Sequence, residues 1–268
     1  MPNKFVIAGT GIVLIAVLGI SAALQNPQEK TELTVEEAYW EQIFAKAFEE
    51  IDCPEPPERN FPDNYYSGPM IDTHIHMQSL PDGAPGLPIE EYSGSNIGTK
   101  RSVSEWVCMM DYEGTSKVFA FFPAWRPITN ESLELVKRTL EMYPDRFVPF
   151  LMTPDSDGDP NGFVTVDAAE LKSMLNIYPG LVKGFGEIGL YGHPGGAPAL
   201  HPDSERLTEI YPVVRENKLL VYFHLGEGQK AEWERALEAN PDITFIWHGD
   251  QLIDCGSCDG TLDDVAEI

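Results

Sequence analysis

From residue 70 onward, apolar runs typical of buried β-strands alternate with amphipathic runs typical of helices, and this alternation limits the possible folds more than any other feature. Nearly continuous apolar strands, each followed by a helix, predict a parallel sheet that is covered by helices. We expect strands over 70–76, 117–122, 146–152, 181–188, 219–224 and 243–248, separated by helices over 102–112, 132–142, 166–175, 204–216 and 229–239. The fold class is therefore α/β, with six recognisable βα strands.

Polar residues that can bind metals recur at the ends of these expected strands. His74 and His76 end the first strand, Glu187 the fourth, His224 the fifth and His248 the sixth. Open sheets usually bind ligands at one switch point, whereas a closed barrel brings the ends of distant strands together. The sequence therefore predicts a (β/α)8 TIM-barrel type of fold, which is incomplete because only six strands are recognisable.

The first expected strand, 70–76, carries the densest group of such residues. Strand alternation places Asp72, His74 and His76 on one face, with about 6.5–7 Å for each two-residue step. Two imidazoles at the end of a strand can converge on one ion, and neutral imidazole suits zinc and related divalent metals. The alternative is two ordinary polar residues where a strand meets a loop.

The N-terminal segment 5–24 is almost wholly apolar, with Thr10 and Ser21 as its polar side chains. Twenty such residues are long enough to cross a bilayer. They also resemble the core of a signal peptide that is cleaved near 21–23. Positive charge before the segment and negative charge after it predict an extracytoplasmic domain. We expect 1–25 to be a signal anchor or signal peptide, so that the protein is membrane-anchored or secreted.

The segment 26–69 reads as a lead-in to the barrel. A helix is expected over 34–51, where Thr34 and Glu37 have the spacing of a capping box. The proline-rich stretch 54–69 then forms a linker or a wrapping arm.

The charge of the chain limits its partners. Its 268 residues include 18 basic and 43 acidic side chains, which gives a net charge of −25. Such a surface repels nucleic acid and anionic headgroups, so a small-molecule substrate is expected, with oligomerisation left open. Four cysteines would permit a disulfide in an oxidising compartment.

An ordered set of motifs resembles the amidohydrolase superfamily of metal-dependent TIM barrels, and within it the amidohydrolase-related family. The similarity extends over about 70–249. The matching segments are Ile71–His76 with its H-x-H pattern, Met109–Gly114, Tyr143–Val148, Val182–Glu187, Val221–His224 and Phe245–Gly249. This family contains hydrolases of esters, lactones and amides, together with non-oxidative decarboxylases of aromatic acids.

The resemblance implies roles for the residues at the strand ends. His74 and His76 would bind the first metal, His224 would be a further metal ligand, and Asp72 would orient a ligand histidine. Glu187 is similar to the fourth-strand carboxylate of TatD-like nucleases, which bridges or supports a second metal. His248 would be a ligand in a two-metal site, or a catalytic acid or hydrogen-bond donor facing substrate in a one-metal site.

Three further residues are candidates near the site. Lys183 lies two alternate steps before Glu187, and we expect it to form an ion pair inside the barrel. Trp125 and Arg126 follow the second strand, where they would line the pocket and hold a substrate carboxylate.

The family pattern requires eight strands and an aspartate at the end of the eighth, whereas only twenty residues follow His248 here. We expect 70–268 to be a truncated amidohydrolase-like barrel. A barrel completed by another chain and a degenerate homologue are the alternatives.

The expected activity is that of a metal-dependent hydrolase, in which one or two divalent ions, zinc by preference, lower the pKa of a bound water toward ~7. A decarboxylase of the same family, in which the metal holds the substrate, is the second hypothesis. A non-catalytic binding module on a broken barrel is the third.

Overall fold

The computed structural model describes residues 33–56, 58, 66, 68–77, 101–124, 130–153, 161–191, 196–226 and 228–247. The chain divides into two compact units, Met1–Leu33 and Thr34–Ile268, and every element named below belongs to the second. The expected anchor or signal peptide, 1–25, lies outside the described residues. Within those ranges, no helix is both long and apolar enough to cross a bilayer.

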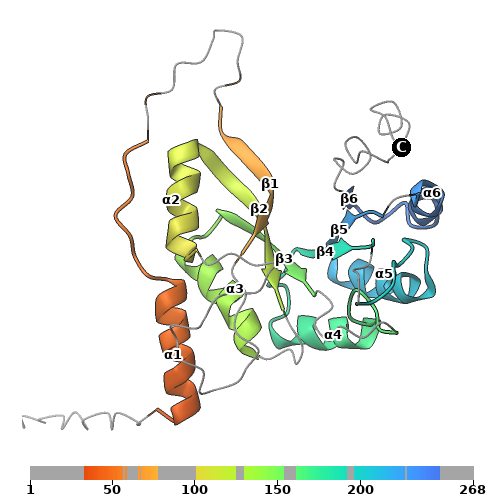
Figure 1. Cartoon of the computed structure of the whole chain (residues 1–268), viewed down its shortest axis with the longest axis horizontal. Helices are drawn as coiled ribbons and strands as arrows, with labels where there is room; N and C mark the ends of the chain where they lie inside the picture. The colour runs from red at the N-terminus through yellow and green to blue at the C-terminus, as the bar shows by residue number, and fades with distance from the viewer. Residues whose placement is uncertain are drawn as a thin grey trace, which may run out of the picture. The chain divides into compact units, whose positions relative to one another are not determined.

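Six parallel strands form a curled half-barrel in which spatial order follows sequence order (Figure 1). The strands are β1 (Met70–His76), β2 (Thr115–Pro123), β3 (Phe147–Met152), β4 (Gly184–Gly189), β5 (Leu220–His224) and β6 (Phe245–Trp247). Each pairs in parallel with the next one along the chain. The predicted fold class, an incomplete α/β barrel of the TIM type, is confirmed.

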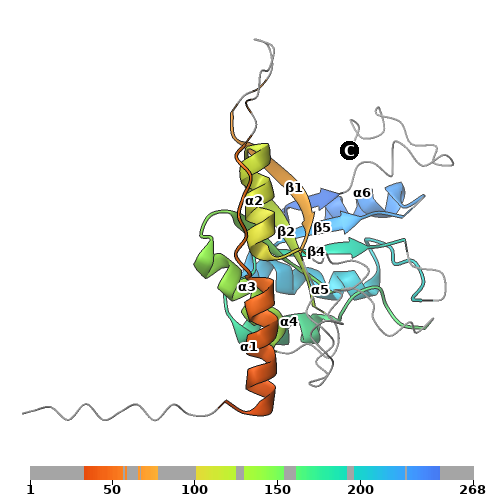
Figure 2. The same ribbon diagram turned by 60° about the vertical axis from the view of Figure 1, so that its left-hand side comes forward.

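A helix connects each strand to the next, as parallel pairing requires. The helices are α1 (Val35–Ala47), α2 (Val103–Glu113), α3 (Asn130–Met142), α4 (Ala168–Ile177), α5 (Glu205–Asn217) and α6 (Lys230–Ala239). Helices α2 to α6 cover the convex side of the strands (Figures 1 and 2). The predicted capping box at α1 is confirmed, since Thr34 N donates to Glu37 Oε2 at 2.8 Å and Glu37 N donates to Thr34 Oγ1 at 3.2 Å.

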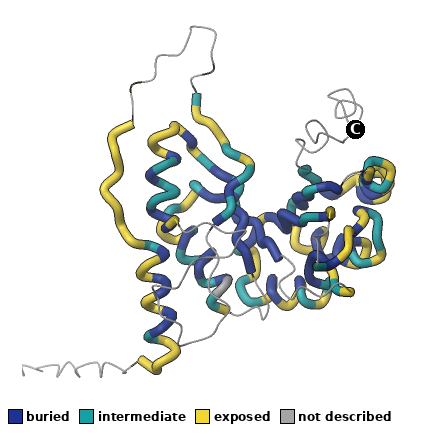
Figure 3. The backbone as a smooth tube through the Cα atoms, viewed as in Figure 1, coloured by how far each residue is buried: buried dark blue, intermediate teal, exposed yellow. Residues whose placement is uncertain are grey.

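Buried residues are concentrated in strands β2 to β5, while the helices have many exposed residues (Figure 3). A large apolar cluster fills the space between the sheet and the helices, and α1 contributes to it. A second, smaller cluster lies on the other face of the strands and consists of Phe121, Phe150, Met152 and Tyr222. The second cluster fills the concave interior of the half-barrel, where β2, β3 and β5 face one another.

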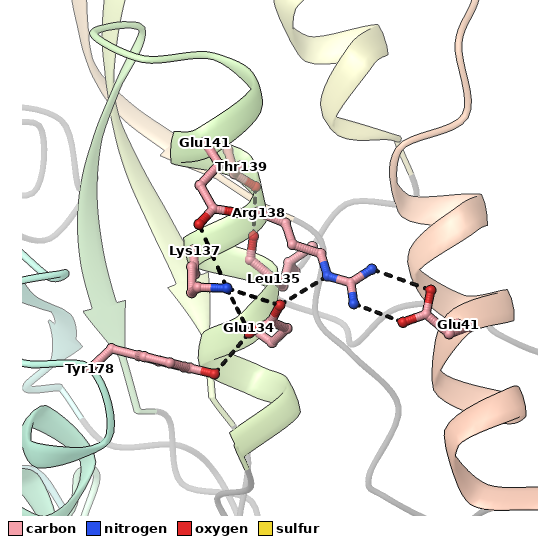
Figure 4. A network of polar contacts seen from close by, with 8 residues as sticks. All are labelled: Glu41, Glu134, Leu135, Lys137, Arg138, Thr139, Glu141 and Tyr178. Atoms are coloured by element: carbon pink, nitrogen blue, oxygen red, sulfur yellow. Dashed lines mark hydrogen bonds and ion pairs between the residues drawn. The ribbon is translucent and has the colours of Figure 1, made fainter. Parts of the chain in front are cut away.

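Two kinds of contact attach the lead-in to this body. Arg138 on α3 donates to Glu41 of α1 at 2.8 Å, and its guanidinium lies 4.2 Å from the centre of the Phe44 ring (Figure 4). Cys53, which follows α1, forms a disulfide with Cys108 of α2, with 5.4 Å between the two Cα atoms. Cys108 is buried, with 4% of its surface exposed.

Candidate metal centre

A bulge in β1 positions the two histidines of the first strand. Asp72 lies opposite Val118, but Ile75 lies opposite Ala120, so β1 contains one more residue than β2 over this stretch. The carboxylate of Asp72 accepts a hydrogen bond from the backbone N–H of His74 at 2.9 Å. Bulges re-aim side chains near functional sites, and this one lies between Asp72 and Ile75, beside the two imidazoles that approach each other.

A second bulge, in β4, positions Glu187. Phe185 pairs with Val221 and Ile188 with Phe223, which leaves Gly186 and Glu187 opposite a single residue of β5. Gly186 has a φ of 123°, and a Cβ atom there would lie 2.3 Å from the carbonyl oxygen of Tyr222. Only glycine fits this backbone conformation and this contact, so it fixes the direction of the carboxylate that follows.

Three potential ligand atoms meet where these bulges face each other. His74 Nε2 and His76 Nε2 lie 2.9 Å apart, and each lies 3.0 Å from Glu187 Oε2. The three residues form the candidate metal-binding group of the described part of the chain. The predicted convergence of side chains from β1 and β4 is thus present in the structure.

The carboxylate of Glu187 is buried and ionised. Its side chain is 6% exposed. Burial would raise the pKa of Glu187, but hydrogen bonds from His224, His74 and His76 outweigh it and hold this pKa far below its usual range. The Phe121 ring packs edge-on against His74 at 5.1 Å and contacts His76 at 5.6 Å. The interior cluster therefore provides an apolar floor, on which charge interactions are stronger than in water.

His224 contacts the other oxygen of the same carboxylate. Its Nδ1 lies 2.7 Å from Glu187 Oε1, at the end of β5. The ring of Tyr191, in the loop after β4, packs edge-on against the His224 ring with 4.8 Å between centroids. Sequence reasoning missed Tyr191, because a lone tyrosine in a glycine-rich loop shows no periodic pattern.

A buried amide, also missed by the sequence analysis, links the loops around the site. Gln229, 4% exposed, donates to the carbonyl oxygens of Leu190 and Leu200 at 3.2 and 3.1 Å. Its own oxygen accepts from Gly226 N at 2.8 Å. One side chain thereby connects the loop after β4 with the loop after β5. The only sequence signal is a glutamine beside two glycines.

Two imidazole nitrogens and one carboxylate oxygen fit a divalent transition-metal ion. Imidazole and carboxylate groups bind zinc, manganese and related divalent ions. The donor set therefore suits a divalent metal without selecting zinc.

The remaining predicted site residues lie in different surroundings or outside the described part of the chain. Lys183 was expected inside the barrel, and this is wrong, because its side chain is exposed and its Nζ donates to Gly180 O at 2.7 Å. Asp72 bonds to the backbone of His74. His248, Trp125 and Arg126 lie outside the described residues.

No protein-family model matches the chain, and no curated protein does. Two solved structures of 5-carboxyvanillate decarboxylase from Novosphingobium aromaticivorans are 18% identical to it, with TM-scores of 0.31 and 0.32. The matches cover 66% of this chain and 56% and 55% of those chains, so the chain spans little more than half of their length. Both contain manganese and a nitrobenzoic acid ligand. Neither family nor activity follows at this similarity, and membership in the amidohydrolase superfamily stays a prediction.

Proposed function

We propose that this chain carries the metal centre of a metal-dependent enzyme that acts on a small molecule. The observation that supports this most is the convergence of His74, His76 and Glu187 from two bulged strands. Surface ion pairs rarely bring two imidazoles and a buried carboxylate to one point. In this proposal the three side chains bind a divalent ion, and His224 keeps the second carboxylate oxygen in place.

A divalent ion at this position would supply Lewis-acid polarisation of a substrate oxygen. The protein residues would do the rest. Glu187 would provide a fixed negative charge, and the two histidines of β1 would hold the ion in position. The interior cluster around Phe121 would exclude water from the buried side of the ion. Such a site can bind a carboxylate or a carbonyl oxygen that faces the open side of the half-barrel.

Among the candidate reactions, we favour non-oxidative decarboxylation. Hydrolysis requires a base that takes a proton from the attacking water, and in this proposal the carboxylate of Glu187 is a metal ligand and does not serve as that base. Decarboxylation breaks the bond between a substrate carbon and its carboxylate, and that carbon then takes up a proton. This reaction has no need for the water-activating base.

The test uses the full chain, with and without His74→Ala/His76→Ala. Bound metal is measured after exposure to Mn²⁺ or Zn²⁺ followed by dialysis, and release of carbon dioxide is then followed with a panel of aromatic acids. We expect about one equivalent of metal, lost in the variant, and metal-dependent carbon dioxide release. Cleavage of esters, lactones or amides instead would support the hydrolase hypothesis. Metal binding with no turnover would support a binding module, and absence of metal binding would refute the centre.

We also propose that the folded unit functions outside the cytoplasm. The disulfide between Cys53 and Cys108 supports this, because such bonds persist in oxidising compartments. The apolar segment 5–24 is consistent with export. Mass spectrometry of the protein isolated from its own cells under thiol-blocking conditions tests the point, since a reduced pair would contradict it.

A further inference from the structure

Tyr191 lies next to the metal centre without belonging to it. It follows the end of β4 by two residues, and its ring packs edge-on against that of His224, with 4.8 Å between centroids and 74° between planes. His224 in turn contacts Glu187 at 2.7 Å. Tyr191 is nevertheless 39% exposed, which is high for a large side chain packed against a buried polar centre. Tyr191 therefore reaches the candidate ligands through His224, and part of the residue is accessible from solution.

The neighbouring backbone packs closely against Tyr191. A Cβ atom on Gly189 would lie 3.1–3.3 Å from three atoms of the phenol, and one on Gly226 would lie 3.2 Å from the Cα of Tyr191. The preceding residue, Leu190, donates its N–H to the carbonyl of His224 at 2.8 Å. The Leu190 carbonyl accepts from buried Gln229. Gly189 thus leaves room for the ring and Gly226 for the backbone of Tyr191, and hydrogen bonds on the adjacent residue hold this segment at the end of β5.

Packing against the His224 ring would not by itself require a tyrosine. An aliphatic residue could cover this ring as well. A phenol has an apolar ring that packs against the imidazole and an O–H that acts as a donor at neutral pH. The candidate ligands are a carboxylate and two imidazoles, so a neutral O–H donor beside them would add a hydrogen bond to a negatively charged substrate oxygen.

We propose that Tyr191 is a substrate-contacting residue, whose hydroxyl donates a hydrogen bond to a carboxylate oxygen of a small molecule bound at the metal. This inference rests on the proposed function, since it requires a metal at His74, His76 and Glu187. It assigns to this chain a small anionic substrate and gives the loop after β4 a direct part in recognition.

The test measures binding of benzoate, a simple carboxylate probe, to the Mn²⁺-loaded full chain by isothermal titration calorimetry. Tyr191→Phe keeps the ring and removes the hydroxyl. Gly189→Ala places a methyl group against the ring and is expected to shift it by a few tenths of an ångström. Tyr112→Phe is the matched control, because Tyr112 is 41% exposed and lies on α2. Binding of Mn²⁺ alone is measured for every variant.

We expect Tyr191→Phe to bind Mn²⁺ like the wild type and to bind benzoate about tenfold more weakly, as the loss of a hydrogen bond to a charged oxygen implies. Gly189→Ala should weaken benzoate binding by a smaller factor, and Tyr112→Phe should leave it unchanged. Equal benzoate binding by wild type and Tyr191→Phe would overturn the inference while leaving the metal centre standing. So would a Mn²⁺-loaded wild type that does not bind benzoate, or a Tyr191→Phe variant that loses the metal. Failure of the wild type to bind Mn²⁺ would instead refute the proposed function itself.

Discussion

Two glutamates organise polar networks in different parts of this molecule, and both have a lowered pKa. Glu134 on α3 is 20% exposed and is bonded to Arg138, Lys137 and Tyr178 (Figure 4). Glu187 on β4 is 6% exposed and contacts three imidazoles. The charge of Glu134 is compensated by an arginine and a lysine, which stay cationic at neutral pH.

The two networks differ in how the charge of the glutamate is compensated. The Glu134 network is complete within the protein, because Arg138 also reaches Glu41 and thereby connects α3 with α1. A neutral imidazole, by contrast, has a nitrogen lone pair that can bind a metal ion. A buried carboxylate surrounded by such groups is a favourable place for an added cation. The charge of Glu134 is therefore compensated within the protein, whereas Glu187 lies at the proposed metal centre.

The largest expected effect comes from exchanging each glutamate for its neutral isostere. Glu187→Gln should weaken Mn²⁺ binding by more than about 100-fold, because a charged ligand contributes more than outer partners, whose loss costs about 10- to 100-fold. Glu134→Gln should leave the metal affinity unchanged. Isothermal titration calorimetry of both full-length variants checks this. Equal affinities would remove the distinction between the two networks.

The disulfide tests whether the lead-in and the metal centre are energetically separate. The bond joins cysteines 55 residues apart in the sequence. Cys53→Ser/Cys108→Ser should lower the free energy of unfolding by about 2–4 kcal/mol, since a cross-link restricts the unfolded chain. Urea denaturation measures this change, and Mn²⁺ affinity at a temperature where both proteins are folded should stay the same. A parallel loss of metal affinity would show that the two regions are coupled.

His224 gives a finer test within the metal centre. His224→Ala should weaken Mn²⁺ binding by about 10- to 100-fold, the effect typical of a group that orients a ligand. His224→Asn can return a donor near the position of Nδ1 and should recover part of this loss, because Nδ1 is the atom that contacts Glu187. If asparagine restores nothing, the histidine contributes by binding the metal directly.

The smallest effect is the pH dependence of the Glu134 network. Burial would raise the pKa of Glu134, but hydrogen bonds from Tyr178, Arg138 and Lys137 lower it below 4.5. A lowered pKa adds stability that is present above pH 4.5 and is lost as the pH falls through the folded-state value. Glu134→Gln should therefore cost up to about 1 kcal/mol at neutral pH, and progressively less below pH 4.5. A difference that stays constant between pH 7 and pH 3 would contradict this ionic contribution.

Residue patterns in the sequence predict most of the fold. Each apolar run from residue 70 onward forms one of six parallel strands, and Thr34 caps α1 as its spacing with Glu37 predicts. Burial of alternate or continuous apolar residues is a local property, so it can be read from a single sequence. The candidate site could be predicted to the level of strand ends, which bring His74, His76 and Glu187 together.

Register and loop contacts could not be predicted in the same way. Strict alternation places Lys183 on the same face as Glu187, but the bulge at Gly186 interrupts that alternation, and Lys183 points to solvent. A bulge depends on the neighbouring strand, here on the close contact of Gly186 with Tyr222. Tyr191 and Gln229 contact residues of loops and strand ends that are distant in sequence. Such contacts leave no periodic pattern in the sequence.

The bonds of Gln229 have a consequence for changing the length of the loops beside the proposed metal centre. One amide holds Leu190, Leu200 and Gly226 at once, so the ends of two loops are tied to a common point. Insertions at those ends would break bonds in both loops, and the cost of an unsatisfied buried amide would be added to any local strain. Substitution of Tyr191, which lies between two of these anchors, would leave the three hydrogen bonds of Gln229 intact.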